Sequence, residues 1–539
     1  MDGVTASPES MHDVTASPAT VHDVTASPET MLDVLERRAA VAPEAALVRF
    51  EDGASLGVGE CRDRAMAVAR GLAGVVAPGD RVLTCLRPGP RLVEVMFALA
   101  RLGAVEVPLA LDVPSAAARR LAAATGARVL IAGTDAVSGH AGLVALAAET
   151  ERTVLVAERE EVEVPGAVGM GDLLASPGRL PARRPGPGDP AVVMATSGTT
   201  GRAKGALLPH FAGVRQARRV AVSMGYGPGD VLFNVFPWNH INVRHAGLLP
   251  ALLSGATLVA HARFSASRFW EICREEGVTA FNFMGAMVAI LERAAGPDRR
   301  HRVRRAYGGP APAGLSRRFA DRFGVVLLEA YACTELGDVA VSTAEVRRPG
   351  SAGRPVPEYE VAIRGEDGRR LPAGEVGQIT VRPAAESMIF SGYAGDDAAT
   401  ADVLRDGWFT TGDRGRLDED GFLYFAGRRA DVIRRRGENI ASWEVEQVVA
   451  AMPGVLEVAA VGVASELTEE EVLVAVTAAP GATVRASEVH AWCAGRLPRH
   501  AVPRYVRVLD DLPRNAATKV VKGELRDQGV PPGTWDACR

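Results

Sequence analysis

One stretch constrains the fold more than any other: an apolar run that breaks abruptly into a glycine-rich loop. Residues 191–195 (AVVMA) have the character of a buried strand, and residues 196–205 (TSGTTGRAKG) follow directly. Glycines allow positive φ angles and let a backbone approach a ligand closely. Backbone N–H groups, hydroxyls and an ammonium are the donors that bind phosphates. The stretch therefore predicts a strand followed by a phosphate-binding loop.

This loop differs from the Walker pattern, because Lys204 follows Gly201 by three residues and is not followed by Ser or Thr. Taken alone, a flexible surface loop after a strand would explain it as well, since loops of Gly, Ser and Thr are common. The phosphate interpretation therefore depends on other segments. Its candidate ligands are Thr196, Ser197, Gly198, Thr199, Thr200, Gly201 and Lys204.

A chain of 539 residues is too long for one core, so at least two domains are expected. The net charge of −4 offers no attractive field for nucleic acid or for an anionic membrane. The six cysteines include no CxxC pair, which argues against a zinc site or a disulfide framework. The longest apolar stretch, residues 93–111, is interrupted by Arg101 and Glu106. We expect a cytoplasmic protein without nucleic-acid or membrane partners.

The first residues form a tandem repeat, in which VTASP recurs at 4–8, 14–18 and 24–28. Such low-complexity sequence has little to bury, so residues 1–29 are expected to form a disordered tail. They lack the basic start and the apolar run of a signal peptide. Folding is expected to begin at Thr30, which with Asp33 resembles a helix capping box.

From Thr30 to about Arg184, helical patterns alternate with short apolar strands, which is typical of parallel α/β layers. The expected helices are 61–76, 92–102 and 116–125, and the expected strands are 82–86, 104–109, 129–132 and 153–156. The alternation resumes after Gly205. There the expected strands are 231–237, 257–260, 281–285, 306–312 and 325–329, with a helix at 265–276 and a solvated arginine-rich turn at 299–305.

Beyond Gly350 the pattern changes to short strands and Asp-Gly turns, which are hairpin signals. A β-rich subdomain is therefore expected at about 355–427. The last hundred residues contain two helical patterns (443–452 and 486–497) and two strands (457–463 and 472–478), enough for a small separate α+β domain. The expected division is a domain of residues 30–428 and a C-terminal domain of residues 429–539.

Five short segments, read in order, resemble the signature segments of the adenylate-forming superfamily, which contains acyl-CoA synthetases, amino-acid adenylation domains and firefly luciferase. They are TSGTTGRAKG (196–205), YACTE (331–335), TGD (411–413), GRRADVIRRRGENI (427–440) and LPRNAATK (512–519). The resemblance spans about residues 30–526. It implies an α/β fold in which layered α/β subdomains and a β-rich subdomain precede a small mobile α+β domain, as in acetyl-CoA synthetase.

The resemblance implies an ATP-dependent acid–thiol ligase that uses ATP, Mg²⁺ and coenzyme A. Activating a carboxylate with ATP brings two anions together, so positive charge is needed where they meet. Lys519 would deliver such a charge to the α-phosphate and the carboxylate, with Lys522 as a competitor. Glu335 would bind Mg²⁺, Thr334 would contact the α-phosphate, and the loop at 196–205 would hold the β- and γ-phosphates.

The same resemblance implies the nucleoside site. Tyr331 would offer a flat face to adenine, and the turn after Gly308, comprising Gly309, Pro310, Ala311 and Pro312, would line the other side. Asp413 would accept hydrogen bonds from the ribose hydroxyls, with Arg428 beside the same sugar. Taken singly, Asp413 and Arg428 would be interpreted as surface residues, and only their order along the chain favours the functional role.

The segments FPWNHIN, FSASRFWEICREEGVTAFNFMGAM and RRAYGGPAP are most similar to the crotonobetaine/carnitine-CoA ligase-like branch. They imply an acyl pocket with His240, Phe281, Asn282, Gly285 and Gly308. A lone histidine is more often structural, but His240 follows the Pro-aromatic pattern of the acyl segment. Trp238 and Asn239 replace the aspartate of amino-acid-activating relatives, which favours a plain carboxylic acid. The small residues would leave room for a bulky or specialised-metabolite acid.

Arg436 and Gly437 would lie on the path of coenzyme A, although a solvated strand edge explains the arginines equally well. Ala430 stands at the hinge, where the family has a polar residue. Two alternatives remain open: loading of a carrier-protein phosphopantetheine, and a non-catalytic nucleotide-binding relative. The oligomeric state is not encoded in any motif, and a homodimer is one option.

Overall fold

The computed structural model describes residues 28–138, 141–157, 164–197, 203–294, 300–428, 431–435, 438–465, 469–479, 481–514 and 520–538. Several predicted residues lie outside these ranges: Gly198, Thr199, Thr200, Gly201, Ala430, Arg436, Gly437 and Lys519. The repeats at 4–8 and 14–18, and most of the third, do so as well. Among the described residues, no helix combines the length and apolar character that crossing a membrane requires.

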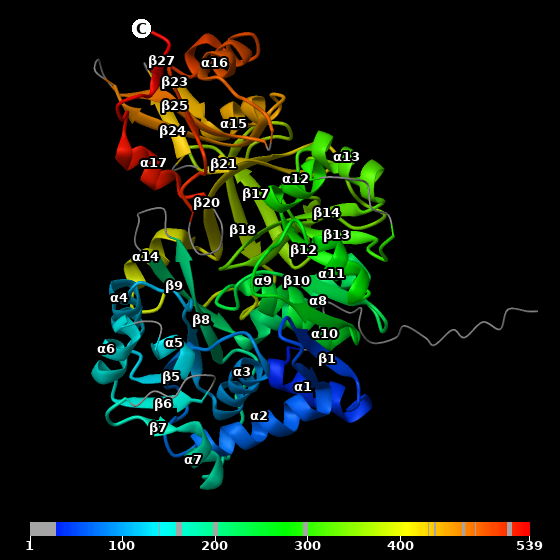
Figure 1. Ribbon diagram of the computed structural model, residues 1–539, viewed down its shortest axis with the longest axis vertical. Helices are drawn as coiled ribbons and strands as arrows, with labels where there is room; N and C mark the ends of the chain where they lie inside the picture. The colour runs from blue at the N-terminus through cyan, green and yellow to red at the C-terminus, as the bar shows by residue number, and fades with distance from the viewer. Residues whose placement is uncertain are drawn as a thin grey trace, which may run out of the picture.

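A seven-stranded sheet forms the first α/β layer, shown in cyan and teal in the lower part of Figure 1. Its strand order is β7 (Val168–Gly169), β6 (Arg152–Val156), β5 (Val129–Gly133), β3 (Arg81–Cys85), β4 (Val105–Pro108), β8 (Pro190–Ser197) and β9 (Ala203–Pro209). The neighbours are parallel except for the antiparallel pair β8–β9. The helices of this part are α2 (Val58–Leu72), α3 (Pro90–Leu102), α4 (Ser115–Thr125), α5 (Thr134–Ser138), α6 (Ala141–Glu149) and α7 (Met170–Ala175).

A nine-stranded sheet forms the second layer. Its order is β16 (Arg354–Pro355), β15 (Gly337–Val341), β14 (Val326–Cys333), β13 (Arg305–Gly309), β12 (Ala280–Met284), β10 (Val231–Asn234), β11 (Thr257–Ala260), β1 (Ala46–Phe50) and β2 (Ser55–Gly57). Its helices are α1 (Met31–Val41), α8 (His210–Met224), α9 (Ile241–Val243), the π-helical turn η1 (Arg244–Leu248), α10 (Leu249–Ser254), α11 (Phe269–Glu275), α12 (Gly285–Arg293) and α13 (Ala313–Phe323).

Strand β14 belongs to two kinds of pairing. Its first half pairs with β13 in parallel, and its second half pairs with β15 in antiparallel fashion. The β14–β15 register shifts between Tyr331 and Ala332, which face Ala340 and Asp338, so Val339 is an extra residue in β15. The change of partner occurs at the carboxyl end of the parallel strands, where binding sites of open α/β sheets occur.

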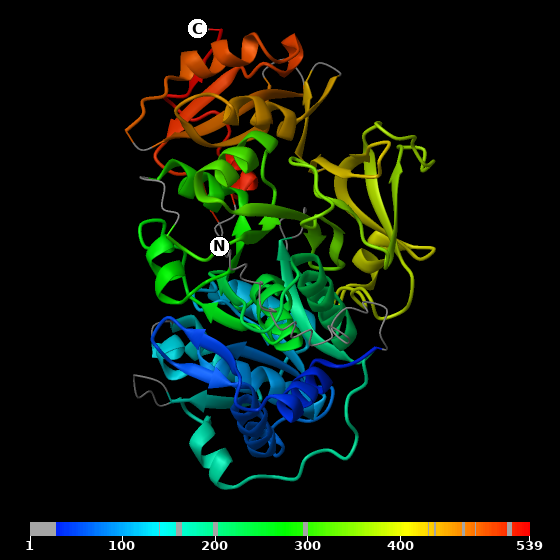
Figure 2. The same cartoon turned by 90° about the vertical axis from the view of Figure 1, so that its right-hand side faces the viewer.

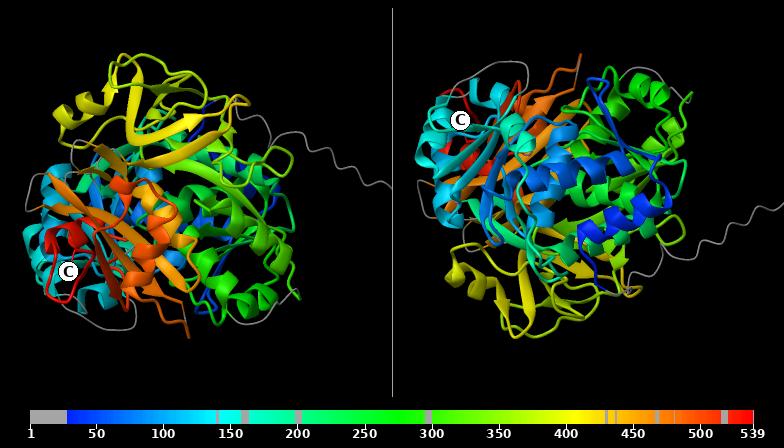
Figure 3. Two further views of the ribbon diagram at one scale, coloured as in Figure 1. Left: turned by 90° about the horizontal axis from the view of Figure 1, so that it is seen from above. Right: turned by 90° about the horizontal axis from the view of Figure 1, so that it is seen from below.

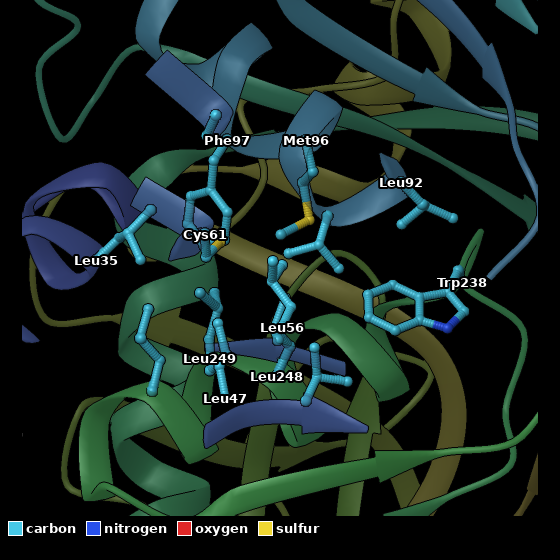
Figure 4. Packing of buried hydrophobic residues seen from close by; sticks show 14 of the residues in the cluster. Leu35, Leu47, Leu56, Cys61, Leu92, Met96, Phe97, Trp238, Leu248 and Leu249 are labelled. Carbon is cyan, nitrogen blue, oxygen red and sulfur yellow. The ribbon is translucent and has the colours of Figure 1, made fainter. Parts of the chain in front are cut away.

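The largest apolar core lies between the two layers. Figure 4 shows Leu47 and Leu56 from β1 and β2, Leu248 and Leu249 from the second layer, and Phe97 of α3 packed together. Trp238 lies at the edge of this cluster, on the side of Leu92. Helix α8 is buried along nearly its whole length, including its arginines. Burying so many charges requires specific partners. Arg218 pairs with Glu29, Arg219 pairs with Glu358, and Arg215 donates to the Leu336 carbonyl.

The predicted β-rich subdomain is confirmed and projects to one side in Figures 2 and 3. It consists of β17 (Tyr359–Arg364), β18 (Gly377–Pro383), α14 (Asp397–Val403), β19 (Leu404–Arg405), β20 (Trp408–Leu417) and β21 (Leu423–Arg428). Asp406 and Gly407 connect β19 to β20 with φ angles of 51° and 75°. Both central residues thus have the positive φ of a tight hairpin turn, as the Asp-Gly signal predicts.

The C-terminal elements form a separate α+β layer, seen at the top of Figure 1 and Figure 2. They are β22 (Val432–Arg435), β23 (Glu438–Ala441), α15 (Ser442–Ala450), β24 (Val455–Ala464), β25 (Glu470–Ala478), α16 (Ala486–Ala494), the 3₁₀ turn η3 (Arg499–Ala501), β26 (Tyr505–Leu509), α17 (Lys522–Gln528) and β27 (Trp535–Asp536). The order β24-β25-β26-β27 forms one sheet with its own apolar clusters. The boundary at residue 428 stays a prediction.

Several local predictions can be compared with the structure. The capping box is confirmed, since the Thr30 side chain accepts from the Asp33 N–H and Asp33 accepts from the Thr30 N–H. Strand β14 continues to Cys333, beyond the predicted end at Glu329. The solvated turn at 299–305 is wrong at its C-terminal end. Arg305 begins β13, and both Arg304 and Arg305 pair with Asp230, which burial keeps away from water.

Candidate active site

Lys204 and Glu335 lie on either side of one tyrosine, Tyr393. The Tyr393 hydroxyl donates to Glu335 Oε1 at 2.8 Å, and Lys204 Nζ lies 4.8 Å from the centre of the Tyr393 ring. The predicted phosphate-loop lysine and the predicted metal ligand, 131 positions apart in the sequence, are thereby brought to one place. A cation over an aromatic face is stabilised by the ring quadrupole.

Residues 391–394 reach this place because they run beside β9. The Ser391 N–H donates to the Leu207 carbonyl, the Leu207 N–H to the Gly392 carbonyl, and the Ala394 N–H to the Gly205 carbonyl. Ala206 and Tyr393 form an antiparallel bridge. On the other side of β9, Lys204 faces Thr196 of β8, whose hydroxyl donates to the Lys204 carbonyl at 3.3 Å. Ser197 ends β8 where the loop begins.

The segment after β14 is held from behind by buried polar groups. The Leu336 carbonyl accepts from Arg215 Nη2 at 2.6 Å and from the Tyr359 hydroxyl at 2.5 Å, and the Glu335 carbonyl accepts from the Phe390 N–H. Arg215 is fully buried and stacks on Tyr359. These bonds fix the backbone directly after the Glu335 Cα atom, with Thr334 half-buried before it.

The second part of the site joins β14 to the β-rich subdomain. The Tyr331 hydroxyl donates to Asp413 Oδ2 at 2.7 Å, and Arg428 Nε lies 3.5 Å from Asp413 Oδ1. Asp413 and Arg428 are register partners on β20 and β21. Burial, and then the Asp413 charge, raise the pKa of Tyr331, so its hydroxyl stays protonated and acts as the donor. The structure thus brings together Tyr331, Asp413 and Arg428, three of the residues predicted for the nucleoside.

The turn Gly309–Pro312 is connected to β14 through Glu329. Glu329 Oε2 accepts from the Ala311 N–H at 2.8 Å, and Glu329 Oε1 accepts from the Gly350 N–H at 3.2 Å. Burial raises the pKa of Glu329 to about 7, although the two N–H groups lower it. Glu329 and Tyr331 are two positions apart in one strand, so their side chains share a face. The turn therefore lies near the face that carries Tyr331.

The acyl candidates divide into two groups. Asn282 is buried and donates to Asn242 Oδ1 and to the Ala246 carbonyl, both at 2.9 Å. This places Asn282 against the segment that begins with His240, which precedes α9. His240 is half-buried, and burial lowers its pKa. Phe281 is not part of this group, because its ring packs against Phe269 in the aromatic cluster on the opposite face of β12.

Neighbouring backbone occupies the positions that side chains on Gly285 and Gly308 would take. A Cβ atom on Gly308 would lie 1.9 Å from the Phe283 carbonyl oxygen, and one on Gly285 would lie 2.4 Å from the Pro310 carbonyl oxygen. Both positions are filled by backbone. A Cβ atom on Gly309 would meet nothing closer than 3.4 Å. The neighbouring backbone therefore explains why residues 285 and 308 carry no side chain, and their contact with the acyl group stays a prediction.

A magnesium ion fits the residues present. No group of three or more His, Cys, Asp or Glu in the described ranges could hold a metal by itself. Mg²⁺ usually keeps several waters and binds one or two carboxylates together with substrate phosphates. Glu335 can supply one such carboxylate oxygen, and its neighbour Lys204 marks where phosphates are expected.

Sequence reasoning missed Tyr393, Arg215 and Glu329. Tyr393 follows Ser391 and Gly392 in a stretch without hydrophobic periodicity. The only sequence signal at this position is a glycine directly before a tyrosine. Arg215 and Arg219 are four positions apart in a helical pattern, so they fall on the same face of the helix. Two charges on one face suggest that this face is exposed, whereas the structure buries both residues. Glu329 was taken as the end of an apolar strand. In each case the partner is distant in sequence and no local signal identifies it.

Comparison with known proteins gives consistent results. Residues 35–394 match the family model described as "AMP-binding enzyme", and residues 444–519 match "AMP-binding enzyme C-terminal domain". Proteins named crotonobetaine/carnitine–CoA ligase from Salmonella paratyphi B and Salmonella typhimurium are 34% identical over 348 and 351 residues. Each match covers 63% of this chain and 66% of the relative, slightly less than two thirds of its length.

Solved structures share the fold over most of the chain. ATP-bound MatB from Rhodopseudomonas palustris is 25% identical, with a TM-score of 0.82, covering 92% of this chain and 98% of that one. The amide bond synthetase McbA from Marinactinospora thermotolerans is 28% identical, with a TM-score of 0.79, covering 92% and 99%. Both support the α/β fold class with a smaller C-terminal domain.

Proposed function

Because the chain belongs to the AMP-binding enzyme family, we propose that it is an AMP-forming acid–thiol ligase. In the first step, a carboxylate oxygen of the acid attacks the α-phosphorus of ATP, forming acyl-AMP and releasing pyrophosphate. In the second step, the sulfur of coenzyme A attacks the acyl carbon, forming the thioester and releasing AMP. The observation that carries the proposal is the meeting of Lys204 and Glu335 at Tyr393.

The phosphate end of the site would lie between β9 and the segment after β14. Lys204 would place its ammonium beside the β- and γ-phosphates, together with Thr196, Ser197 and the loop N–H groups at 198–201. Thr334 would donate to the α-phosphate. A Mg²⁺ ion on Glu335 would neutralise charge on the phosphates. The Tyr393 hydroxyl occupies one lone pair of Glu335 Oε1 and thereby orients the carboxylate.

The nucleoside end would lie at Tyr331. The ring of Tyr331 would face adenine, with the turn Gly309–Pro312 opposite. Asp413 would accept hydrogen bonds from the ribose hydroxyls, beside the bond that it accepts from the Tyr331 hydroxyl. Arg428, 37% exposed and 3.5 Å from Asp413, would approach the same sugar from the solvent side.

The acid would bind beside the His240 segment. At neutral pH His240 is uncharged, because burial lowers its pKa, so it would donate one hydrogen bond without adding charge. Asn282 supports the segment through Asn242 and does not contact the acid in this proposal. The substrate is proposed to be a carboxylic acid that needs no buried counter-ion for a second charge.

Residues 30–428 would carry both substrate sites, and residues 429–539 would form a mobile domain that delivers Lys519 in the first step. Lys522, the competing lysine, already has partners. Its Nζ lies 2.8 Å from Glu446, 2.9 Å from the Ser442 hydroxyl and 3.6 Å from Asp431. These contacts stabilise the C-terminal elements and favour Lys519 as the catalytic lysine.

The first experiment is exchange of labelled pyrophosphate into ATP in the presence of benzoate, isobutyrate, cyclohexanecarboxylate or crotonobetaine, with hydroxylamine trapping of acyl-AMP. Acid-dependent exchange is expected with at least one member of this panel. Its absence with the whole panel, together with undetectable ATP binding by calorimetry, would favour the non-catalytic alternative.

The acceptor is tested separately. Coenzyme A is expected to be the preferred acceptor, as the names of the Salmonella relatives suggest. A holo-carrier protein and a simple amine are the competing acceptors, the amine because McbA is an amide bond synthetase. Faster transfer to the holo-carrier would replace coenzyme A as the thiol, and faster transfer to the amine would replace the thioester by an amide. Acyl-AMP formation stays in place in either case.

The assignment of the lysine has a matched control. Lys519→Ala is expected to abolish acyl-AMP formation but to retain thioester formation from supplied acyl-AMP. Lys522→Ala should instead lower the melting temperature and slow both steps to a similar extent. Equal loss of both steps in Lys519→Ala would remove Lys519 from the catalytic role.

A further inference from the structure

A buried ion pair connects the two α/β layers beside the His240 segment. Arg244 Nη1 and Nη2 lie 2.5 and 2.8 Å from the two carboxylate oxygens of Glu106. The two side chains are only 4% and 5% exposed. Glu106 is on β4 of the seven-stranded sheet, and Arg244 begins η1 in the second layer. The Thr84 hydroxyl also donates to Glu106, at 2.7 Å.

The third guanidinium nitrogen, Nε, connects this ion pair to the segment that contains His240. We call the contacts of Arg244 with Glu106 and with the Trp238 carbonyl the clamp. Arg244 Nε donates to the Trp238 carbonyl. The two ends of the segment Trp238–Arg244 are therefore joined by one side chain, and His240 lies in the closed segment. Within the same segment, Asn242 accepts from both Asn234 and Asn282 at 2.9 Å. The segment is thus held against β4, β10 and β12.

The two histidines near the ion pair, His210 and His245, do not provide a positive charge for Glu106, whereas Arg244 does. A cavity of about 20 Å³ beside the pair is lined by His210 and His245 as well as by Glu106 and Arg244. Burial lowers the pKa of His210 to about 4 and that of His245 to about 3. Both rings are neutral at pH 7 and do not compete with Arg244 for the carboxylate.

An apolar contact could join the layers without burying charge. Removing two charges from water is unfavourable, and apolar residues of similar volume often stabilise a protein equally well. Met96, Val192 and Leu249 already line the same cavity. An apolar side chain at position 244 could not donate to the Trp238 carbonyl. What the pair adds is therefore a fixed geometry of the segment.

We propose that Arg244 is a positioning residue, which through the Trp238 carbonyl and Glu106 holds His240 at the acid-binding site. The part of this inference that concerns the acid rests on the proposed function. The part that concerns the position of His240 does not, because it predicts a property of the protein without substrate.

The test compares single and double substitutions. Arg244→Met leaves Glu106 buried without its counter-charge and is expected to lower the melting temperature strongly. The double variant E106M/R244M removes both charges and is expected to recover most of the melting temperature. It still lacks the bond to the Trp238 carbonyl, so a role in positioning is separated from a role in stability.

Two measurements on the double variant decide the matter. Histidine NMR, with His240 assigned through His240→Gln, should show the His240 pKa rising toward 6.5 as the segment opens to water. For the panel acid with the highest exchange rate, KM should rise about tenfold or more while KM for ATP changes less than about twofold. The matched control R504M/D536M removes another two-bond pair, distant from the segment, and should change neither quantity.

A double variant with the wild-type His240 titration and the wild-type KM for acid would overturn the proposal. The wild-type protein could show no acid-dependent pyrophosphate exchange with any acid of the panel while the double variant shows a shifted His240 titration. This result would support the role of Arg244 in holding His240 and would contradict the proposed reaction. A raised KM for acid with an unshifted titration would also overturn it, because Arg244 would then act on the acid by another route.

Discussion

The Tyr331 hydroxyl donates to the Asp413 carboxylate at 2.7 Å, joining the nine-stranded sheet to the β-rich subdomain. This bond connects the segment 331–335, which was predicted to bind nucleotide, with a residue 82 positions away. The two parts of the Tyr331 side chain therefore have different proposed roles. The ring faces adenine, and the hydroxyl holds Asp413.

Tyr331→Phe and Tyr331→Leu are expected to differ. Tyr331→Phe removes only the bond to Asp413 and should change the Kd for ATP less than about threefold, while lowering the melting temperature. Tyr331→Leu also removes the aromatic face. Stacking on a base contributes about 1–3 kcal/mol, so the Kd for ATP should rise about tenfold or more. Calorimetry with ATP measures both, and equal losses would contradict a stacking role.

Tyr393→Phe is expected to weaken the response to magnesium. The substitution keeps the ring beneath Lys204 but removes the hydroxyl that orients Glu335. A hydrogen bond to a charged group contributes about 1.5–3 kcal/mol, so the Mg²⁺ concentration for half-maximal pyrophosphate exchange should rise about tenfold. Tyr226→Phe is the control, because the Tyr226 hydroxyl has no hydrogen-bond partner in the described part of the chain. An unchanged magnesium response would exclude orientation of Glu335 by Tyr393.

Glu329 is expected to make stability depend on pH. Its pKa is about 7 in the folded protein against an ordinary value of 4.5, so the folded state binds more protons between these values. Stability from this group is fully present below pH 4.5 and is lost as the pH rises through 7. The loss is on the order of 3 kcal/mol.

Thermal unfolding of Glu329→Gln tests this expectation. An amide cannot titrate, so the difference in melting temperature between pH 5 and pH 8 should shrink relative to the wild type. The absolute melting temperature should fall at pH 5, because the amide nitrogen cannot accept from the backbone N–H that it faces. A variant with the wild-type pH dependence would show that another group titrates.

Gly308→Ala is expected to destabilise the fold and not merely to narrow a pocket. The added Cβ would meet the Phe283 carbonyl at 1.9 Å, so β12 and β13 must separate. Overpacking of this kind costs about 1–3 kcal/mol or more. Gly171→Ala in α7 meets nothing within 4 Å and should leave the melting temperature unchanged or raised. A stable Gly308→Ala with raised KM for acid would support the ligand interpretation.

Local signals predicted much of the fold because they concern neighbours in sequence. Thr30 with Asp33, Asp406 with Gly407, and the alternating segments between Thr30 and Arg184 each act within a few residues. The solvated turn predicted at 299–305 failed at its C-terminal end, where Arg305 begins β13, for the opposite reason. Asp230, the partner of Arg304 and Arg305, lies more than seventy positions earlier, and nothing near the arginines indicates it.

For the candidate site, residue identities were predictable and supporting contacts were not. The motif residues Lys204, Tyr331, Glu335 and Asp413 were recognised from their order. Some of the supporting contacts end on a backbone carbonyl, as the bond from Arg215 to Leu336 does, and a carbonyl has no sequence signature. The backbone packed against Gly285 and Gly308 was not predictable, because a missing side chain can be required by a neighbouring strand as well as by a ligand.

The extra residue Val339 in β15 determines where insertions and deletions can be accommodated in this hairpin. Ala340 faces Tyr331 and Asp338 faces Ala332, so the two β15 residues present opposite faces although they are two positions apart. Only with the extra residue do Asp338 and the Tyr307 hydroxyl meet while Tyr331 keeps its own face. Deleting one residue between 334 and 340 would move the side chains of the rest of the hairpin to the opposite face of the sheet, so that buried and exposed positions exchange. Length variants of this protein should therefore be tolerated in the exposed turn at 344–347 but not between Cys333 and Val341.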